Sequence, residues 1–93
     1  MLGLPFNIAS YGLLLHLLAA EAGLKEGKLV GFLADTHIYM NHAEGASEQA
    51  KREPLPLPHL FTDKPAPFFE WTHEHTSLRD YSHHAKINYP IAV

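Results

Sequence analysis

The sequence predicts one small α+β domain, and three observations carry this prediction. The 93 residues are 46% hydrophobic and 18% charged, proportions that belong to a folded chain rather than a disordered one. Apolar residues recur every three to four positions between Leu4 and Ala22, which is the period of a helix. Between Leu29 and Met40 the pattern changes to a two-residue alternation, the period of a strand. We therefore expect residues 1–93 to form a single domain.

The expected first helix spans Leu4 to Ala22. Pro5 suits its first turn, where a missing N–H group costs no hydrogen bond. Leucines on its other sides leave little polar surface, which is typical of a helix that is buried on most sides. Gly23 stands where many helices end in a residue of left-handed conformation, so the helix is expected to stop there.

The expected strand, Leu29 to Met40, has two different faces. One face is mostly apolar, and the other begins apolar and ends in Asp35, His37 and Tyr39. An acid, an imidazole and a phenol on one side of a strand can form a binding site. A strand whose end simply reaches solvent gives the same pattern, so both interpretations stay open at this point.

Further elements are expected downstream. Asn41 can serve as the N-cap of a polar helix, with Glu44 at the reciprocal capping-box position. A run of alternating prolines then forces extended backbone. The bulky side chains of residues 68–71 are expected to anchor the core. The expected elements are a helix at 41–52, a strand at 57–62, a turn at 63–67 and an edge strand at 72–81.

Composition also excludes several classes of function. Seven basic residues against ten acidic ones, with no basic stripe, argue against a nucleic-acid partner. The longest apolar stretch, Gly12 to Ala20, is too short to span a membrane, and no signal-peptide pattern is found. We therefore expect no membrane partner and a cytoplasmic location. The chain contains no cysteine, which excludes disulfides, thiolate zinc sites and a cysteine nucleophile within it.

Eight histidines raise the question of a metal site. His73-Glu74-His75 and His83-His84 contain side chains that zinc accepts as ligands. No complete metal motif is found, however, and ordinary surface or core histidines explain the same pattern. No metal site is therefore assigned, and a non-catalytic His-rich metal-binding or interaction module is kept as an alternative.

Four ordered motifs together reach from Leu2 to Val93. They are Leu-Gly-Leu-Pro-Phe-Asn-Ile-Ala-Ser-Tyr at 2–11, Asp-Thr-His-Ile-Tyr-Met-Asn-His at 35–42, Arg-Glu-Pro-Leu-Pro-Leu-Pro at 52–58 and Ile-Ala-Val at 91–93. In this order they resemble the C-terminal third of the thymidylate synthase family, which implies that a buried helix packs on a mixed sheet. Two departures are Leu55, where the family has a second arginine, and the loss of two prolines in 81–87.

The resemblance implies a nucleotide site for dUMP. Asn7 matches the asparagine whose amide reads the uracil edge, and an amide offers both the donor and the acceptor that this edge needs. Relatives that act on dCMP tend to carry aspartate there, so Asn7 indicates a uracil substrate. His37 and Tyr39 match the pair that binds the deoxyribose 3′-hydroxyl, and Asp35 is given a supporting role.

The resemblance also implies 5,10-methylenetetrahydrofolate as co-substrate, the donor of both the carbon and the reducing equivalents. One group of matching residues lines the folate pocket, and the C-terminal group folds over the bound folate and excludes water. The first group is Leu2, Gly3 and Phe6, and the second is Ile91, Ala92 and Val93.

The family's catalytic cysteine lies upstream of the matched region. So do the arginines that grip the dUMP phosphate, several of which come from the partner subunit of a homodimer. The resemblance therefore implies the C-terminal part of an enzyme that methylates dUMP to dTMP, with an N-terminal portion outside this chain. We assign no catalytic residue and expect the chain to be inactive alone. A relative that adds water instead of hydride, a dUMP hydroxymethyltransferase, is an alternative that Asn7 does not exclude.

Overall fold

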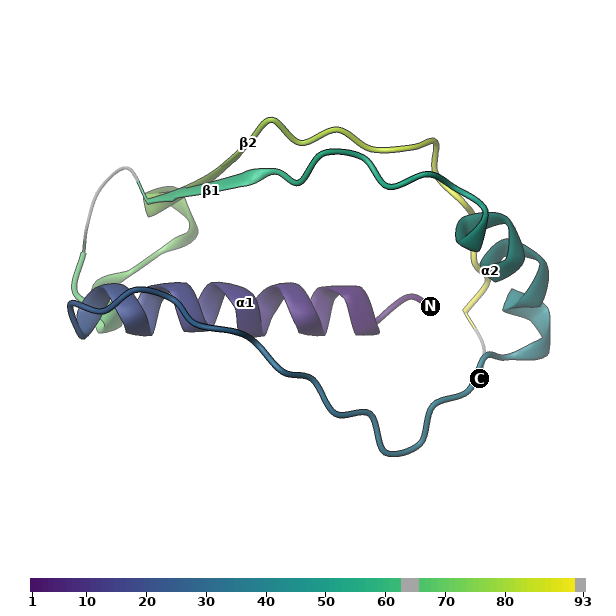
Figure 1. Cartoon of the computed structure of the whole chain (residues 1–93), viewed down its shortest axis with the longest axis horizontal. Helices are drawn as coiled ribbons and strands as arrows, with labels where there is room; N and C mark the ends of the chain where they lie inside the picture. The colour runs from purple at the N-terminus through teal and green to yellow at the C-terminus, as the bar shows by residue number, and fades with distance from the viewer. Residues whose placement is uncertain (63–65, 92–93) are drawn as a thin grey trace. The chain divides into compact units, whose positions relative to one another are not determined.

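A computed structural model describes residues 1–62 and 66–91 and confirms the α+β class. The chain divides into two compact units: the first unit is Met1–Arg52 with Lys86–Val93, and the second unit is Glu53–Ala85. Among the described residues, no helix combines the length and the apolar character that crossing a membrane requires. The elements, in chain order, are α1 (Leu4–Glu21), the 3-10 helix η1 (Met40–His42), α2 (Ala43–Ala50), β1 (His59–Thr62), the 3-10 helices η2 (Phe68–Glu70) and η3 (His73–His75), and β2 (Thr76–Arg79) (Figure 1).

Helix α1 has nearly the predicted bounds. Pro5 lies in its first turn, and Gly23 has a φ of +66°, the left-handed conformation expected of it. The Gly23 N–H donates to the Ala20 carbonyl at 3.1 Å, and the Leu24 N–H donates to the Ala19 carbonyl at 2.8 Å. These bonds satisfy carbonyl groups that the end of a helix leaves without partners, so the sequence set this boundary locally.

The predicted burial of α1 is wrong for the chain as described. Ala19, 8% exposed, is the one buried residue of this helix, whereas Ile8 and Tyr11 are 53% and 62% exposed. A helix with apolar residues on every side needs cover on every side. In the first unit, the segment at residues 29–33 lies against α1 and lines a cavity with it. One extended segment is too narrow to cover the apolar residues on the other sides of the helix.

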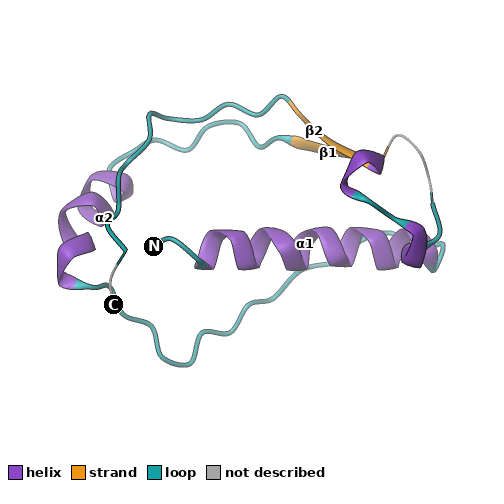
Figure 2. Cartoon of the chain, turned by 180° about the vertical axis from the view of Figure 1, so that it is seen from behind, coloured by secondary structure: helices purple, strands orange, loops and turns teal. Residues whose placement is uncertain are grey.

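The strand predicted at Leu29–Met40 is also wrong. The backbone from Leu24 to Tyr39 is neither helix nor strand, and Met40 begins η1 (Figure 2). Extended backbone becomes a strand only when a neighbour accepts and donates its hydrogen bonds. In residues 1–62 and 66–91 the paired strands are β1 and β2, which run antiparallel. The expected mixed sheet is therefore corrected to a two-stranded antiparallel ribbon.

The helix predicted at 41–52 is present but starts later, at Ala43. Tyr39 is extended, and the 3-10 turn that follows takes up Met40–His42. Asn41 therefore lies inside this turn, and His42 occupies the N-cap without a side-chain capping bond. The predicted N-cap at Asn41 and its capping box with Glu44 are wrong, because the N-cap lies one residue later, at His42.

The second unit is built on the β1–β2 ribbon. Its register pairs His59 with Arg79 and Thr62 with Thr76, so both strands lie within the predicted ranges but are shorter. The Arg79 guanidinium lies 4.3 Å from the centre of the Phe61 ring, within the range of a cation–π contact. Of the predicted turn at 63–67, residues 63–65 lie outside the described part of the chain.

Local contacts shape the approach to β2. Thr72 and His75 form a reciprocal capping box around η3, and the Trp71 indole N–H donates to the Thr76 hydroxyl at 2.8 Å. Phe69, in contrast, is 96% exposed. The expectation that residues 68–71 anchor a core is therefore wrong at Phe69, since this short ribbon offers it no second layer to pack against.

Candidate functional site

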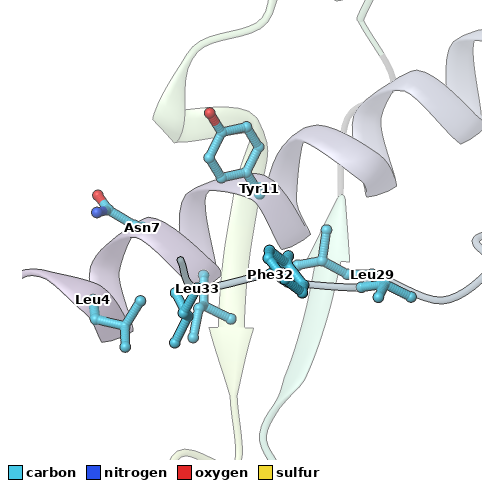
Figure 3. A pocket seen from close by; sticks show the side chains of 9 residues that line it. Leu4, Asn7, Tyr11, Leu29, Phe32 and Leu33 are labelled. Carbon is cyan, nitrogen blue, oxygen red and sulfur yellow. The ribbon is translucent and has the colours of Figure 1, made fainter. Parts of the chain in front are cut away.

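A cavity of about 360 Å³ lies between α1 and the segment that follows it. Asn7 and Tyr11 come from α1, and Leu29, Phe32 and Leu33 come from the neighbouring segment (Figure 3). Residues three and four apart on a helix share one face, which explains why Asn7 and Tyr11 reach the same cavity. The lining is Leu4, Asn7, Ile8, Tyr11 and residues 29–33, so Asn7 and Tyr11 are the residues with polar side chains in an otherwise apolar set.

The segment beside this cavity is joined to α1 by a side-chain hydrogen bond. The His16 ring Nδ1 contacts the carboxylate of Glu26, ten residues further along the chain. A backbone hydrogen bond, and after it the hydrogen bond with His16, lowers the pKa of Glu26 below its ordinary value of 4.5. Because Glu26 precedes residues 29–33 by a few positions, this pair limits how far the segment can move from α1.

Asp35, His37 and Tyr39 form a second group. The His37 Nδ1 lies 3.4 Å from an Asp35 carboxylate oxygen, and the His37 and Tyr39 rings meet edge to face with centres 5.3 Å apart. The two-residue alternation placed these side chains on one side, and their mutual contacts agree with it although no strand forms. All three residues are exposed.

A third group surrounds His42, which is 3% exposed. Its ring centre lies 5.8 Å from that of Tyr39 and 5.1 Å from that of Tyr89. The His42 Nε2 lies 2.6 Å from the Pro90 carbonyl oxygen, and the Tyr89 hydroxyl donates to the Gln49 side chain at 2.9 Å. Sequence analysis missed this group, because a histidine before a helix and a Tyr-Pro pair near the C-terminus are each common.

The residues expected to contact folate are mostly open to solvent. Leu2, Phe6 and Ile91 are 44%, 76% and 82% exposed, and a Cβ added at Gly3 would meet no atom within 4 Å. Ala92 and Val93 lie outside the described residues. The N-terminal turn of α1 and the C-terminal segment thus each present apolar surface that a flat ring could cover.

The sequence-predicted residues therefore occur as separate groups. The cavity at Asn7 is lined by neither His37 nor Tyr39, nor by Leu2, Gly3 or Phe6. His37 and Tyr39 contact each other and Asp35. The convergence of Asn7, His37 and Tyr39 on one ligand stays a prediction. Ile8, Tyr11 and residues 29–33 are lining residues that sequence analysis did not single out, although the spacing of Leu4, Ile8 and Tyr11 on one helix face was a usable signal.

The histidines do not assemble into a metal centre in the part of the chain that is described. There, no three histidine or acidic side chains lie close enough together to hold an ion. The His75 Nδ1 instead accepts from the Thr72 backbone N–H at 2.9 Å. A ring N–H of His84 donates to the Glu53 carbonyl at 2.8 Å. These two rings serve as hydrogen-bonding groups within the second unit.

The fold is that of an α+β chain with one amide residue beside an apolar cavity and an exposed His–Tyr pair. Comparison with protein families gives its class: the family model described as thymidylate synthase matches residues 1–93. The chain belongs to the thymidylate synthase family, a family of transferase enzymes. The 93 residues contain no cysteine, so they do not include that family's nucleophile.

Proposed function

We propose that this chain supplies the uracil-, deoxyribose- and folate-contacting part of an enzyme that methylates dUMP to dTMP. The observation that carries the proposal is the family match over residues 1–93, within which Asn7, His37 and Tyr39 stand at the motif positions. The carbon donor and reductant is 5,10-methylenetetrahydrofolate, and the complete enzyme is a cytoplasmic homodimer.

Asn7 recognises the uracil ring. A side-chain amide donates to a carbonyl and accepts from the adjacent ring N–H, which is the pattern that uracil presents. The Asn7 cavity supports this role, because its walls are mostly apolar and its volume of about 360 Å³ falls within the range of small-molecule sites. A cytosine edge presents the opposite pattern, so an amide held in this one orientation selects against dCMP.

His37, Tyr39 and Asp35 hold the deoxyribose. When the His37 Nδ1–H points to the Asp35 carboxylate, 3.4 Å away, the Nε2 lone pair is left to accept a proton from a ligand hydroxyl. The Tyr39 phenol can donate to the oxygen of that hydroxyl. One donor and one acceptor, held edge to face at 5.3 Å, thus suit a single 3′-hydroxyl group, and Asp35 fixes the tautomer.

The residues assigned to folate fit a flat, largely apolar ring system. Phe6 and Ile91 expose apolar side chains, and Gly3 leaves open space. The bound folate supplies the one-carbon unit and the hydride. Leu2, Phe6 and the C-terminal residues cover the rings and exclude water, which would otherwise compete for the reacting carbon. Gly3 lets the ring approach the backbone, and Ala92 and Val93 extend the cover beyond the described residues.

The chain alone is inactive in this proposal. Methylation of C5 requires a thiolate that first adds to C6 of the uracil ring, and losing a nucleophile costs many orders of magnitude in rate. The phosphate-binding arginines also lie outside residues 1–93. The test therefore compares the chain with a polypeptide, or a pair of polypeptides, that adds the cysteine-bearing region encoded upstream.

The experiment is growth of a thymidine-requiring bacterium that lacks its own dTMP synthesis. Expression of the chain together with the upstream coding sequence is expected to restore growth without thymidine, and residues 1–93 alone are not. The purified protein is then incubated with dUMP and methylenetetrahydrofolate, and the nucleotide product is identified by its mass. A dTMP product supports the proposal, 5-hydroxymethyl-dUMP supports the hydroxymethylating alternative, and no product contradicts both.

Asn7→Asp sharpens this test. An ionised carboxylate only accepts hydrogen bonds, so kcat/KM for dUMP is expected to fall by at least about a hundredfold, as when a site leaves a substrate's polar group unpaired. Leu33→Ile, a change in the apolar wall of the same cavity, is the control and should change kcat/KM by only a few-fold. Equal effects of the two variants would contradict the role of Asn7 in reading the ring.

A further inference from the structure

Three contacts fix the C-terminal segment 87–91 to η1 and α2. The His42 ring donates to the Pro90 carbonyl across 48 residues of chain, at 2.6 Å. The Tyr89 hydroxyl donates to Gln49 at 2.9 Å. Gly45 brings the backbone of α2 so close that an added Cβ would stand 2.7 Å from the Tyr89 ring. Each contact joins the end of the chain to residues 42–49.

His42 is the central contact of the three. At 3% exposure its ring is shielded from water, and its Nδ1 is buried without a hydrogen-bond partner. The Pro90 carbonyl can only accept, so Nε2 must carry the proton and Nδ1 the lone pair. Pro90 itself is exposed and the bond is part-buried, so water can replace the lost donor, and removing the donor costs about the net contribution of one hydrogen bond.

We infer that His42 is a positioning residue that holds the C-terminal segment at Pro90 and thereby sets where Ile91 meets the folate. The folate part of this inference rests on the proposed function. His42 acts through another residue and contacts no proposed ligand itself. Ile91 directly follows Pro90 and is 82% exposed. The contacts with η1 and α2 therefore end where the residues proposed to face the ligand begin.

The same ring touches the proposed nucleotide site. His42 and Tyr39 meet edge to face with centres 5.8 Å apart, and His42 and Tyr89 meet at 5.1 Å. A substitution at His42 therefore has to be separated from a disturbance of Tyr39. His42→Phe keeps the ring contacts and removes the donor, whereas His42→Gln restores an N–H group at the position of Nε2 and loses the ring.

Trypsin digestion of the chain tests the hold without any activity measurement. Cleavage after Lys86 requires the neighbouring segment to come loose, and Lys25, exposed in the first unit, is an internal reference site in the same sample. The cleavage rate after Lys86, divided by that after Lys25, is expected to rise by roughly three- to tenfold in His42→Phe, the effect of one lost hydrogen bond. His42→Gln is expected to stay near the wild-type ratio.

His84→Phe is the matched control, because His84 also donates a ring N–H to a backbone carbonyl, that of Glu53, at 2.8 Å, but from an exposed position in the second unit. It should leave the cleavage ratio at Lys86 unchanged. An unchanged ratio in His42→Phe would overturn the inference. So would a rise in His42→Gln equal to that in His42→Phe, because the donor would then not be the holding group.

Kinetics of the assembled enzyme test the consequence for folate. His42→Phe is expected to raise KM for methylenetetrahydrofolate on the order of tenfold and to change KM for dUMP by less than about threefold, with His42→Gln close to wild type. Equal increases in both KM values would overturn the positioning role at the folate site. If no assembled enzyme makes dTMP, the proposed function fails, while the digestion result still decides whether His42 holds the segment.

Discussion

The two units of the chain are held together in different ways. In the second unit, the Trp71–Thr76 and Thr72–His75 bonds join residues five and three positions apart, and the exposed His84–Glu53 bond joins residues 31 positions apart. In the first unit, His42–Pro90 and Tyr89–Gln49 join residues 48 and 40 positions apart. All residues assigned to the proposed ligand sites belong to the first unit. The part of the chain with the proposed chemistry is thus the part whose contacts reach furthest along the chain.

This difference has an energetic meaning. Bringing two distant residues together costs more chain entropy than bringing neighbours together, so each long-range contact has to offset a larger loss. A single substitution at a long-range contact should therefore release a whole segment. A substitution at a short-range contact should loosen only its own turn. Substitutions at both kinds of contact test this contrast, and the largest effect is expected at a glycine of α2.

Alanine at two helical glycines should have opposite effects. At Gly45 an added Cβ meets the Tyr89 ring at 2.7 Å and Ile87 at 3.0 Å, whereas at Gly12 it meets nothing within 4 Å. Gly12→Ala should stabilise α1 by up to about 1 kcal/mol through helix propensity. Gly45→Ala gains the same propensity but overpacks, so the net cost is about 1–2 kcal/mol.

Urea unfolding followed by far-ultraviolet ellipticity measures both glycine variants. Gly45→Ala should also raise the trypsin cleavage ratio at Lys86, because it displaces Tyr89 from α2, and Gly12→Ala should not. A stabilising Gly45→Ala variant with an unchanged ratio would show that the close approach of Tyr89 is not needed to hold the C-terminal segment.

What the sequence could predict follows the same division. The bounds of α1 came from Pro5, Gly23 and a helical period, all of which act within one helix turn of the residues they govern. The positions of β1 and β2 were predicted from the run of prolines that forces extended backbone before β1 and from the expected turn at 63–67. The strand expected at 29–40 failed because a strand also needs a partner, and no local pattern tells whether a partner is present.

The candidate site divides in the same way. The contact of Asp35, His37 and Tyr39 was predictable, because alternate residues of extended backbone share a side. The burial of His42 was not, because it depends on Tyr89 and Pro90, about 48 residues later. Asn7 was assigned from its motif. Its cavity could not be predicted, because hydrophobic periodicity does not specify where residues 29–33 run along α1.

The next largest effect on stability is expected at the Trp71–Thr76 hydrogen bond, a short-range contact of the second unit. Thr76→Val keeps the shape of the side chain and removes the hydroxyl that accepts from the Trp71 indole N–H at 2.8 Å. The loss should destabilise this turn by about 1 kcal/mol, the usual net value of one hydrogen bond. Trp71 is the only tryptophan of the chain, so its fluorescence reports this unit directly.

The Thr76→Val variant should shift the urea midpoint seen by Trp71 fluorescence to lower concentration and leave the Lys86 cleavage ratio unchanged. Thr62→Val, the cross-strand partner of Thr76 in the register, is a matched substitution that leaves the indole bond in place. If Thr76→Val also releases residues 87–91, the two units are more strongly coupled than their separate contacts indicate.

The smallest effect is expected at the Glu26–His16 pair, which is local in sequence but belongs to the first unit. A backbone hydrogen bond, followed by the bond with His16, lowers the pKa of Glu26 in the folded chain below 4.5. The ionised carboxylate therefore contributes stability that is fully present above pH 4.5 and is lost as the pH falls through the lowered pKa. Because the Glu26 side chain is about half exposed, solvent and salt screen the pair.

Glu26→Gln should have a lower urea midpoint than the wild type at pH 6, and the difference should disappear as the pH is lowered towards 3. Glu44→Gln, on the exposed first turn of α2, controls for the loss of one negative charge. A difference that stays constant over this pH range would contradict the lowered pKa and assign the effect to packing. If the urea midpoints of Glu26→Gln and the wild type converge gradually, the pair contributes through the ionised carboxylate. Its effect should stay smaller than that of Gly45→Ala, which does not depend on pH, because the pair is a short-range contact within the first unit.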